Sequence, residues 1–423
     1  MISRRKFVVG GLAALAAPVV ATKVISSEQS HGVRLRETAA TSTASTLAVS
    51  VVNNTGSDTV YAYVTGLAID NNNALMLLEA DGQTPYYPSS PSSTNQPVPV
   101  NCAIPLNASG AAGKQITIPH LAGARIWFSI GSPLTFQLNP GPALVEPSVT
   151  NPSDPNINTQ WDFAEFTYND AQVFANISMV DFVCIPIGLG LTDTSGGQQT
   201  VQGLPNGGLD AVCSGLTAQA NADGQGWNQL IVTSGGQNLR ALSPTNGIVM
   251  NSSLFSGYYD GYVNQVYSQY SSATLSVDTQ ASYGTVTGQV SGGQLTFSGV
   301  GSFGPPSAAD IFGCNSGPFS PAGMSGEMLA ILPRLAAAFN RSTLLIDSSQ
   351  PDGENPDDYY ANATTNHYAR LVHATSQDHR GYAFPYDDVA PTGGADQSGA
   401  VSSGSPSLLT VTLGSVHSGP GGR

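Results

Sequence analysis

The feature that most constrains this chain is a series of short, strand-like runs in its first half. The runs are rich in Val, Ile, Thr and aromatic residues, have turn residues between them, and cover residues 46–53, 59–68, 114–119, 124–130, 160–169 and 179–187. Such runs are typical of strands. The stretch 86–100 is rich in Pro and Ser and is expected to be a loop. The first half is therefore predicted to be a β-structure.

The pattern changes after about residue 190, where helical features begin. We expect a short helix over 209–216, a longer one over 252–270 that begins at a Ser N-cap, and a third over 325–340. Ser325 is a good N-cap for the third helix, and Pro333 inside it should kink it or displace its start. Residues 281–300 alternate like a hairpin, and 382–413 return to strand-like sequence.

This order predicts a mainly β protein in which one β-domain is interrupted by an inserted mixed α/β domain. The expected division is 46–190 for the first part of the β-domain, 191–365 for the insertion, 366–415 for the return, and 416–423 for a tail. A length of 423 residues favours about two domains.

The charge balance disfavours some classes of partner. Only 10% of the residues are charged, and the formal net charge is −14. An acidic surface repels nucleic acid and anionic membranes. It is compatible with a neutral polymer such as a polysaccharide, although charge alone does not select one.

The N-terminus has the features of an export signal. Arg4, Arg5 and Lys6 precede a short apolar run that ends near Ala21. The run is too short to span a bilayer comfortably, so we expect a signal peptide over 1–21, a leader over 22–45 and no membrane association after processing. The arginine pair fits a twin-arginine signal and an ordinary signal equally. The mature protein is predicted to be secreted, either extracellular or associated with the cell wall.

Cysteine usage agrees with secretion. The chain has four cysteines, Cys102, Cys184, Cys213 and Cys314, which predict two disulfides with three possible connectivities. No Cys-x-x-Cys or His-x-x-x-His spacing of a metal site is present in the sequence. We therefore expect neither a metal nor a cofactor.

The segment that carries chemistry is the run 161–169 together with Asp181. In a strand, Ala164, Phe166 and Tyr168 would point to one face, and Phe163, Glu165, Thr167 and Asn169 to the other. The second face presents a carboxylate, a hydroxyl and an amide in a row, which suits the hydrogen bonding of a sugar. Asp181 follows Glu165 by 16 positions, enough for a turn and a neighbouring strand. Two carboxylates across a groove are what glycoside hydrolysis requires.

This pattern alone is modest evidence. An acidic residue on a polar strand face is most often simply solvated, and 28 acidic residues offer many chance pairs. From the residues alone, a glycosidase is one hypothesis among several.

Several motifs, taken in order, resemble thaumatin-like proteins. They are Arg125-Ile126-Trp127, the strand 163–169, Ser178-Met179-Val180-Asp181-Phe182 and the corner 381–388. The combination is most similar to the branch that hydrolyses β-1,3-glucan, glycoside hydrolase family 64, as are the runs 310–314 and 333–341. The resemblance covers most of residues 46–415. It implies a thaumatin-like β-sandwich or barrel with an inserted α/β domain, flanking a wide groove.

The resemblance also implies roles for residues. Glu165 matches the family's general acid and Asp181 its general base, in a reaction that inverts the anomeric carbon. Inversion places the two carboxyl groups roughly 6.5–9.5 Å apart, with room for a water. Thr167 and Asn169 match sugar contacts, and Phe163 shares their face. Arg125 and Asp387 or Asp388 match residues of an acidic cleft, with a structural ion-pair network as the alternative.

The chain departs from the family pattern in three places. It has four cysteines where plant thaumatin-like proteins have many disulfides, Asn176 stands where many have Asp, and Phe182 follows Asp181 without the usual Gly. Asn176 also begins a glycosylation sequon.

The sequence does not fit two other common kinds of catalytic or binding site. The Gly313 to Gly317 run does not fit a nucleophile elbow, and no glycine-rich run fits a phosphate or dinucleotide loop. Aromatic residues are more often in the core than in a site. Trp227, in a polar stretch, is the tryptophan we expect to stack on a sugar.

The sequence therefore predicts a secreted, monomeric, endo-acting β-1,3-glucan hydrolase that releases short laminari-oligosaccharides. Its predicted partner is a β-1,3-glucan such as laminarin, curdlan or cell-wall glucan. The alternative is a non-catalytic glucan-binding or antifungal protein of thaumatin-like type. The insertion favours the enzyme, since plain thaumatin-like binders lack it.

Overall fold

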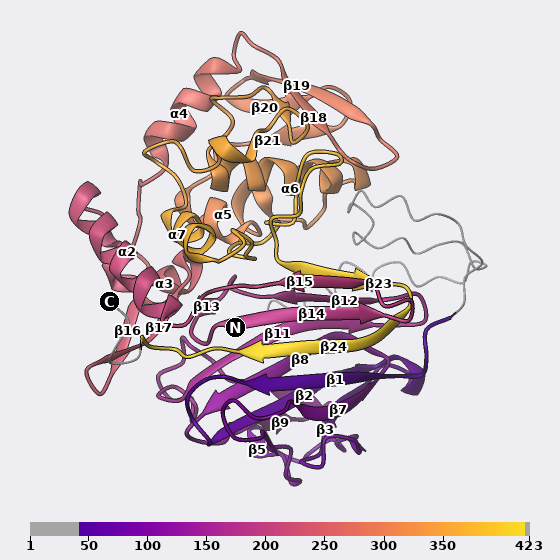
Figure 1. Cartoon of the computed structure of the whole chain (residues 1–423). Coiled ribbons are helices and arrows are strands. Elements are labelled where there is room, and N and C mark those ends of the chain that lie inside the picture. The colour runs from indigo at the N-terminus through magenta and orange to yellow at the C-terminus, as the bar shows by residue number, and fades with distance from the viewer. Residues whose placement is uncertain (1–41, 419–423) are drawn as a thin grey trace. The chain divides into compact units, whose positions relative to one another are not determined.

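The computed structural model describes residues 42–418, so the predicted signal peptide lies outside the described residues. Two large sheets dominate this part of the chain (Figure 1). The five-stranded sheet has the order β15 (Gln198–Val201), β14 (Ile187–Asp193), β24 (Pro406–Leu413), β1 (Thr46–Asn53) and β7 (Lys114–Pro119). The eight-stranded sheet has the order β23 (Ala400–Ser403), β12 (Val173–Ile177), β11 (Gln160–Tyr168), β8 (Leu121–Ile130), β2 (Val60–Ala68), β3 (Ala74–Leu78) and β4 (Pro85–Tyr86), and β6 (Ile104–Pro105) pairs with β2.

Three smaller sheets complete the β-structure of the described residues. One contains β10 (Ala143–Val145), β9 (Gln137–Asn139) and β5 (Gln96–Pro97). The second contains β13 (Phe182–Val183), β17 (Gln237–Leu242) and β16 (Ile231–Ser234). The third contains β21 (Gly301–Phe303), β20 (Gln294–Phe297), β19 (Thr285–Ser291), β18 (Leu275–Asp278) and β22 (Ser349–Gln350). The hairpin predicted within 281–300 is confirmed as β19 and β20.

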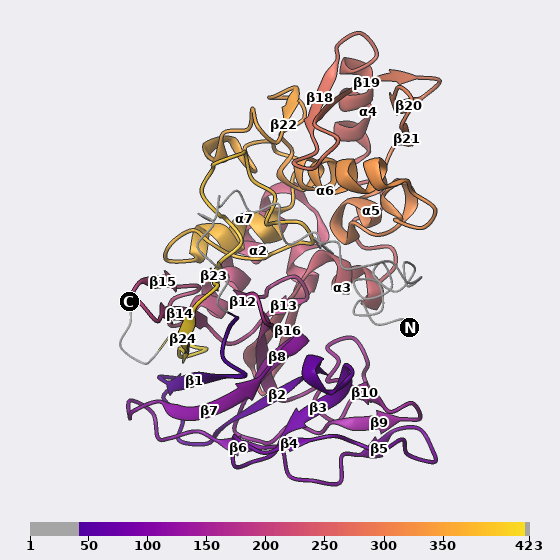
Figure 2. The same cartoon turned by 90° about the vertical axis from the view of Figure 1, so that its right-hand side faces the viewer.

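The helices of the described residues lie between positions 208 and 375 of the chain. They are α2 (Gly208–Asp223), α3 (Pro244–Met250), α4 (Asp260–Gln269), α5 (Ala308–Gly313), α6 (Gly326–Arg341) and α7 (His367–Thr375). Short 3-10 turns are η2 (Ile69–Asn71), η3 (Gly226–Leu230), η4 (Gly317–Phe319) and η5 (Pro356–Asp358). Figure 2 shows α6 beside the sheet that contains β18 and β22, away from β1 and β7. None of the helices among residues 42–418 is both long and apolar enough to cross a membrane.

The helix predictions succeeded to different degrees. The helix α6 is confirmed within one residue of the prediction, with the Ser325 side chain accepting from the Met328 N–H, and Pro333 lies inside it. The short helix expected over 209–216 continues to Asp223, where Gly224 ends it in a left-handed conformation at φ 72°. The helix expected from 252 begins only at Asp260, because Phe255 takes φ 61° and residues 252–259 form turns.

The core follows from strand alternation. Every second residue is buried in β1, in β14 over 187–191 and in β24 over 409–413, and the apolar side chains among them join one hydrophobic cluster with apolar residues of the eight-stranded sheet. Burying apolar area at roughly 25 cal/mol per Å² is the dominant stabilising term for such a cluster.

The prediction of a mainly β protein is confirmed, whereas the thaumatin-like description and the domain boundaries stay predictions.

The four cysteines do not form the two predicted disulfides. Cys102, Cys184 and Cys213 are buried free thiols, and the Cys314 sulfur, also buried, donates to the carbonyl of Ile311 at 3.2 Å. Burial raises the pKa of both Cys102 and Cys213 to about 12, which keeps them as neutral thiols. A thiol in apolar surroundings packs as a small hydrophobic side chain, so the even count was misleading here.

A buried carboxylate joins β11 to the segment that follows β13. The Asp162 side chain accepts backbone N–H groups from Phe163 at 2.8 Å, Cys184 at 3.0 Å and Ile185 at 2.9 Å. Burial raises the pKa of Asp162 to about 7, although these hydrogen bonds and the nearby Arg240 oppose the shift. The contact fixes the segment that contains Asp181 relative to the strand that contains Glu165.

The raised pKa of Asp162 predicts a pH-dependent stability. Between about pH 4 and pH 7 the folded state holds a proton that the unfolded state releases, so the free energy of unfolding should fall as the pH rises. The Asp162→Asn variant has no such proton, and relative to it the wild type should lose about 1 kcal/mol per pH unit in this window. Urea unfolding of both proteins from pH 4 to pH 7 measures the difference. Parallel curves would contradict the prediction.

Candidate active site

The strand register places two of the predicted site residues, Glu165 and Arg125, side by side. Glu165 of β11 is opposite Arg125 of β8 on one side and Asn176 of β12 on the other. Arg125 is in turn opposite Thr65 of β2. Residues directly opposite in adjacent strands share a face of the sheet, so these side chains can interact.

Arg125 is the centre of the charged cluster. Its guanidinium donates from Nε to Glu165 Oε1 at 3.0 Å and from Nη1 to Glu146 Oε2 at 3.2 Å, and it lies 4.1 Å from the centroid of the Phe163 ring. Burial lowers the pKa of Arg125, but Glu165, Glu146 and Asp181 more than offset this, and the pKa is raised. Two carboxylates therefore contact this permanently charged group, and the charge of Asp181 also favours it.

Asp181 is held from two sides. Its backbone carbonyl accepts the Ser243 N–H at 3.0 Å and the Asn246 side-chain N–H at 2.8 Å, at the N-terminus of α3. On the other side, the Asp162 carboxylate accepts the N–H groups of Cys184 and Ile185, which follow Asp181 in the chain. The Asp181 side chain is half-buried, and its charge acts on Arg125. The structure thus fixes the backbone of Asp181 and leaves its side chain partly accessible.

A β-bulge lies next to this cluster. Phe166 pairs with Ala124 and Tyr168 with Leu121, so two residues of β8 oppose Thr167 alone. Gly123 supplies the left-handed conformation at φ 51°, which a glycine adopts without steric cost. Bulges are frequent next to active sites, where they re-aim side chains. Thr167 is half-buried here, beyond Glu165 along the strand.

Asn169 has a structural role. Its side-chain oxygen accepts the N–H groups of Ala171 at 2.9 Å and Gln172 at 3.0 Å, which closes the turn between β11 and β12. Such an Asx-turn is a common use of asparagine. The amide oxygen predicted to contact sugar is therefore already committed to the backbone.

The structure corrects the choice of Asp387. This carboxylate is 1% exposed, pairs with Arg341 at 3.2 Å and His373 at 2.9 Å, and accepts the Ala383 N–H. It belongs to a structural ion-pair network, the alternative weighed for it. Asp388 is half-exposed and accepts the Tyr382 hydroxyl at 3.1 Å, so it is the better candidate of the two.

The two aromatic candidates are also buried. Trp227 is fully buried, contacts Phe255 and His367, and donates its indole N–H to Asp223 at 3.0 Å. Phe163 is 2% exposed and lies under the Arg125 guanidinium. A side chain without accessible surface cannot stack on a sugar, so we withdraw both as direct ligand contacts.

Two residues near the cluster were not predicted. Glu146 pairs with Arg125. The second residue is Tyr382: burial raises its pKa, and the nearby Asp388, Asp387 and Glu165 raise the pKa further. Tyr382 lies in the corner motif 381–388, which is a sequence signal that indicates it. Glu146 lies in a proline-containing loop between β10 and β11, with no periodic pattern to indicate its partner.

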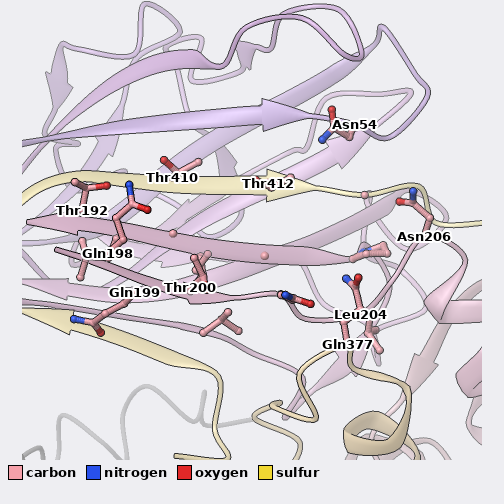
Figure 3. Close-up of a pocket in the computed structure, with 18 residues that line it drawn as sticks. Asn54, Thr192, Gln198, Gln199, Thr200, Leu204, Asn206, Gln377, Thr410 and Thr412 are labelled. Atoms are coloured by element: carbon pink, nitrogen blue, oxygen red, sulfur yellow. The ribbon is translucent and has the colours of Figure 1, made fainter. Parts of the chain in front are cut away.

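A separate hollow lies on the five-stranded sheet, with a volume of about 630 Å³ (Figure 3). Gly188 and Gly190 of β14 contribute to its lining, with Thr410 and Thr412 of β24 and Gln198 of β15 around them. None of the predicted site residues lines it. The lining carries no charged group, so this hollow offers no acid or base.

The fold and the site together define a mainly β protein with an acidic side chain, Glu165, accessible on a sheet face and paired with Arg125. The glycoside hydrolase family 64 model, described as β-1,3-glucanase, matches residues 45–413. The chain therefore belongs to this family of β-1,3-glucanases, as the sequence motifs indicated.

Individual relatives agree with the family. Glucan endo-1,3-beta-glucosidases of Cellulosimicrobium cellulans and of Arthrobacter sp. (strain YCWD3) are each 31% identical over 380 residues. These matches cover 87% of this chain and 65% of each relative, so the chain spans less than two thirds of their length.

Solved structures share the fold. The structure of a laminaripentaose-producing β-1,3-glucanase in complex with laminaritetraose superposes with a TM-score of 0.78 at 32% identity, and covers 88% of this chain and 99% of that one. A β-1,3-glucanase domain from Clostridium beijerinckii gives 0.68 at 24% identity, with 88% and 98% covered. At that lower identity the second match supports the fold alone.

The corrected role of Asp387 predicts a loss of stability. Asp387→Asn removes one of the buried charges that face Arg341, and we expect the free energy of unfolding to fall by about 3 kcal/mol. The adjacent variant Asp388→Asn changes a half-exposed group that accepts one hydroxyl, and should cost below about 1.5 kcal/mol. Denaturant unfolding of the two variants compares them directly. Equal losses would contradict the assignment of Asp387 to the buried network.

Proposed function

We propose that the protein is an inverting, endo-acting β-1,3-glucan hydrolase in which Glu165 is the general acid and Asp181 the general base. The observation that carries the proposal is the hydrogen bond from Arg125 to the partly exposed Glu165 carboxylate, with Asp181 on a backbone segment held by Ser243 and Asn246. Family membership supplies the substrate class. The remaining steps follow from the chemistry of the cluster.

The cluster has the carboxyl groups that acid–base catalysis requires. A general acid must bring a proton to the glycosidic oxygen, and a general base needs an ionised carboxylate beside a water. The Glu165 side chain is 34% exposed and Glu146 only 15%, so Glu165 is the member better placed to reach a ligand.

In the proposed reaction, the Glu165 proton passes to the oxygen of the leaving sugar as the glycosidic bond breaks. A water attacks the anomeric carbon from the opposite face and loses its proton to Asp181. The product then has the inverted configuration. Arg125 keeps the Glu165 carboxyl in one orientation through a hydrogen bond to Oε1. We expect Thr167 and Asp388, both half-exposed near the cluster, to contact sugar hydroxyls.

We further propose that the products are short laminari-oligosaccharides and that the enzyme is secreted and acts as a monomer. The similarity to a laminaripentaose-producing enzyme supports the product class. The basic and apolar pattern of residues 1–21 supports export.

Removing either carboxylate should abolish turnover without removing binding. We expect Glu165→Gln and Asp181→Asn each to lower kcat on laminarin by about 10²–10⁴-fold, the usual contribution of one general acid or base. Reducing-end release measures turnover, and affinity electrophoresis in laminarin measures binding. Glu327→Gln, which alters a half-exposed glutamate at the start of α6, is the matched control and should keep wild-type activity.

The anomeric outcome tests the mechanism separately. Proton NMR of the first products should detect the α-anomer at the new reducing end, as inversion at a β-linkage requires. A β-anomer would overturn the inverting assignment while leaving the hydrolase intact.

The alternative is a non-catalytic glucan-binding protein that uses the same face. It predicts that the wild type binds laminarin and releases no reducing ends, and that Glu165→Gln behaves identically. That result would reject the hydrolase and leave the binding protein.

A further inference from the structure

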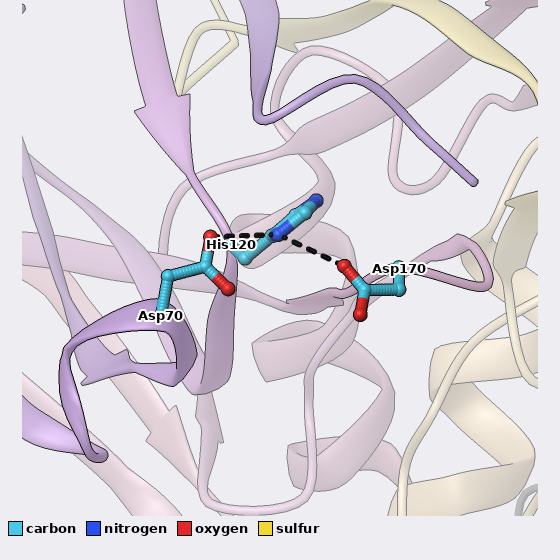
Figure 4. Close-up of side chains that lie close together, drawn as sticks. All are labelled: Asp70, His120 and Asp170. Carbon is cyan, nitrogen blue, oxygen red and sulfur yellow. Dashed lines mark hydrogen bonds and ion pairs between the residues drawn. The ribbon is translucent and has the colours of Figure 1, made fainter.

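A second titratable cluster lies outside the proposed active site. His120, between β7 and β8, is 4% exposed, and its Nδ1 lies 2.9 Å from Asp70 Oδ2 and 3.4 Å from Asp170 Oδ1 (Figure 4). One donor atom from each of the three residues lies within 4.8 Å of the others. Asp70 is in η2 after β2, and Asp170 is in the turn between β11 and β12.

The opposite side of the imidazole fixes its tautomer. The Thr43 hydroxyl donates its single proton to the carbonyl of Asn169 at 2.7 Å. The same oxygen lies 3.0 Å from His120 Nε2, so it can only accept there, and Nε2 must carry a hydrogen. A neutral ring would then have its lone pair at Nδ1, directed at two carboxylates. That arrangement is repulsive unless a positive charge lies between the three groups.

We propose that this cluster is a divalent transition-metal site, with His120 Nδ1, Asp70 and Asp170 as ligands to an ion of the Zn²⁺ type. Ligand atoms at about 2.1 Å around a tetrahedral Zn²⁺ lie about 3.4 Å apart. The nitrogen–oxygen distance to Asp170 equals this spacing, and the distance of 2.9 Å to Asp70 is shorter. An imidazole with two carboxylates favours Zn²⁺ over Ca²⁺, which takes oxygen ligands. The Asp70 and Asp170 side chains are 58% and 82% exposed, so water has access to the remaining coordination position.

The surroundings of His120 are those of a metal ligand. Metal-binding histidines usually donate the second ring N–H to an oxygen, which sets the ring orientation, and Thr43 provides that oxygen. The Tyr168 ring packs against the imidazole with centroids 4.7 Å apart. The ring is thereby held with Nδ1 directed at the two carboxylates.

The ion would connect three segments of the chain that are distant in sequence. It would bind the end of β2, the β7–β8 junction and the β11–β12 turn, and Thr43 would attach the residue just before β1 as well. Asp170 follows the strand that carries Glu165 and Thr167, so the ion would restrain the end of that strand. This is a structural role, separate from the proposed catalytic carboxylates.

The test is a titration of full-length protein, free of any affinity tag and dialysed against a chelator, with ZnCl₂ alone. We expect saturable binding of one ion by isothermal calorimetry and a rise in Tm, since only the folded state assembles the ligands. Asp70→Asn and Asp170→Asn should each weaken binding at least tenfold, and both positions are exposed enough for the variants to fold. Thr43→Val should weaken it roughly 10–100-fold through the ring orientation alone.

The matched control is a histidine–aspartate pair without a second carboxylate. His417 Nδ1 lies 3.1 Å from Asp210 Oδ2, so Asp210→Asn should leave the Zn²⁺ affinity unchanged. Absence of saturable binding by the wild type would overturn the proposal and assign a proton to His120 Nδ1 instead. Binding that persists in both Asp70→Asn and Asp170→Asn would also overturn it, because the ion would then be elsewhere.

Discussion

The position of the two proposed catalytic groups depends on one buried carboxylate, Asp162. Glu165 belongs to a long strand at the centre of a sheet, whereas Asp181 lies in an irregular segment between β12 and β13. The Asp162 oxygens accept the N–H groups of Cys184 and Ile185 and so attach that segment to β11. Burying a carboxylate is costly, and three backbone donors offset much of that cost.

The active-site charges are organised in the same way, with one fixed group serving several partners. Arg125 of β8 pairs with Glu165 of the adjacent strand and with Glu146 of a loop, and its guanidinium lies over the Phe163 ring. One guanidinium thus pairs with the proposed general acid and with a second carboxylate, Glu146, to which we assign no catalytic role. Arg341 also pairs with two carboxylates, Glu354 and Asp387, but both of these are buried.

The sequence was informative wherever a local rule decides the outcome. Strand alternation placed Ala164, Phe166 and Tyr168 in the core and left Glu165 and Thr167 accessible, and a Ser N-cap located α6. It failed where burial depends on partners distant in sequence. Trp227 lies in a polar stretch but is covered by α7 and the 255–258 turn, and Asp387 is distinguished from Asp388 only by Arg341 and His373. The disulfide prediction failed because an even cysteine count says nothing of distance.

The pairing of β1 with β24 has a consequence for how the protein is made. The strand nearest the start of the described chain pairs in parallel with residues 408–413 of β24, and the same six residues also pair with β14. Until they are synthesised, two sheet edges stay open, each a template for pairing with another chain. The five-stranded sheet cannot close before residues 406–413 are synthesised, so the segments that precede them carry open strand edges until then.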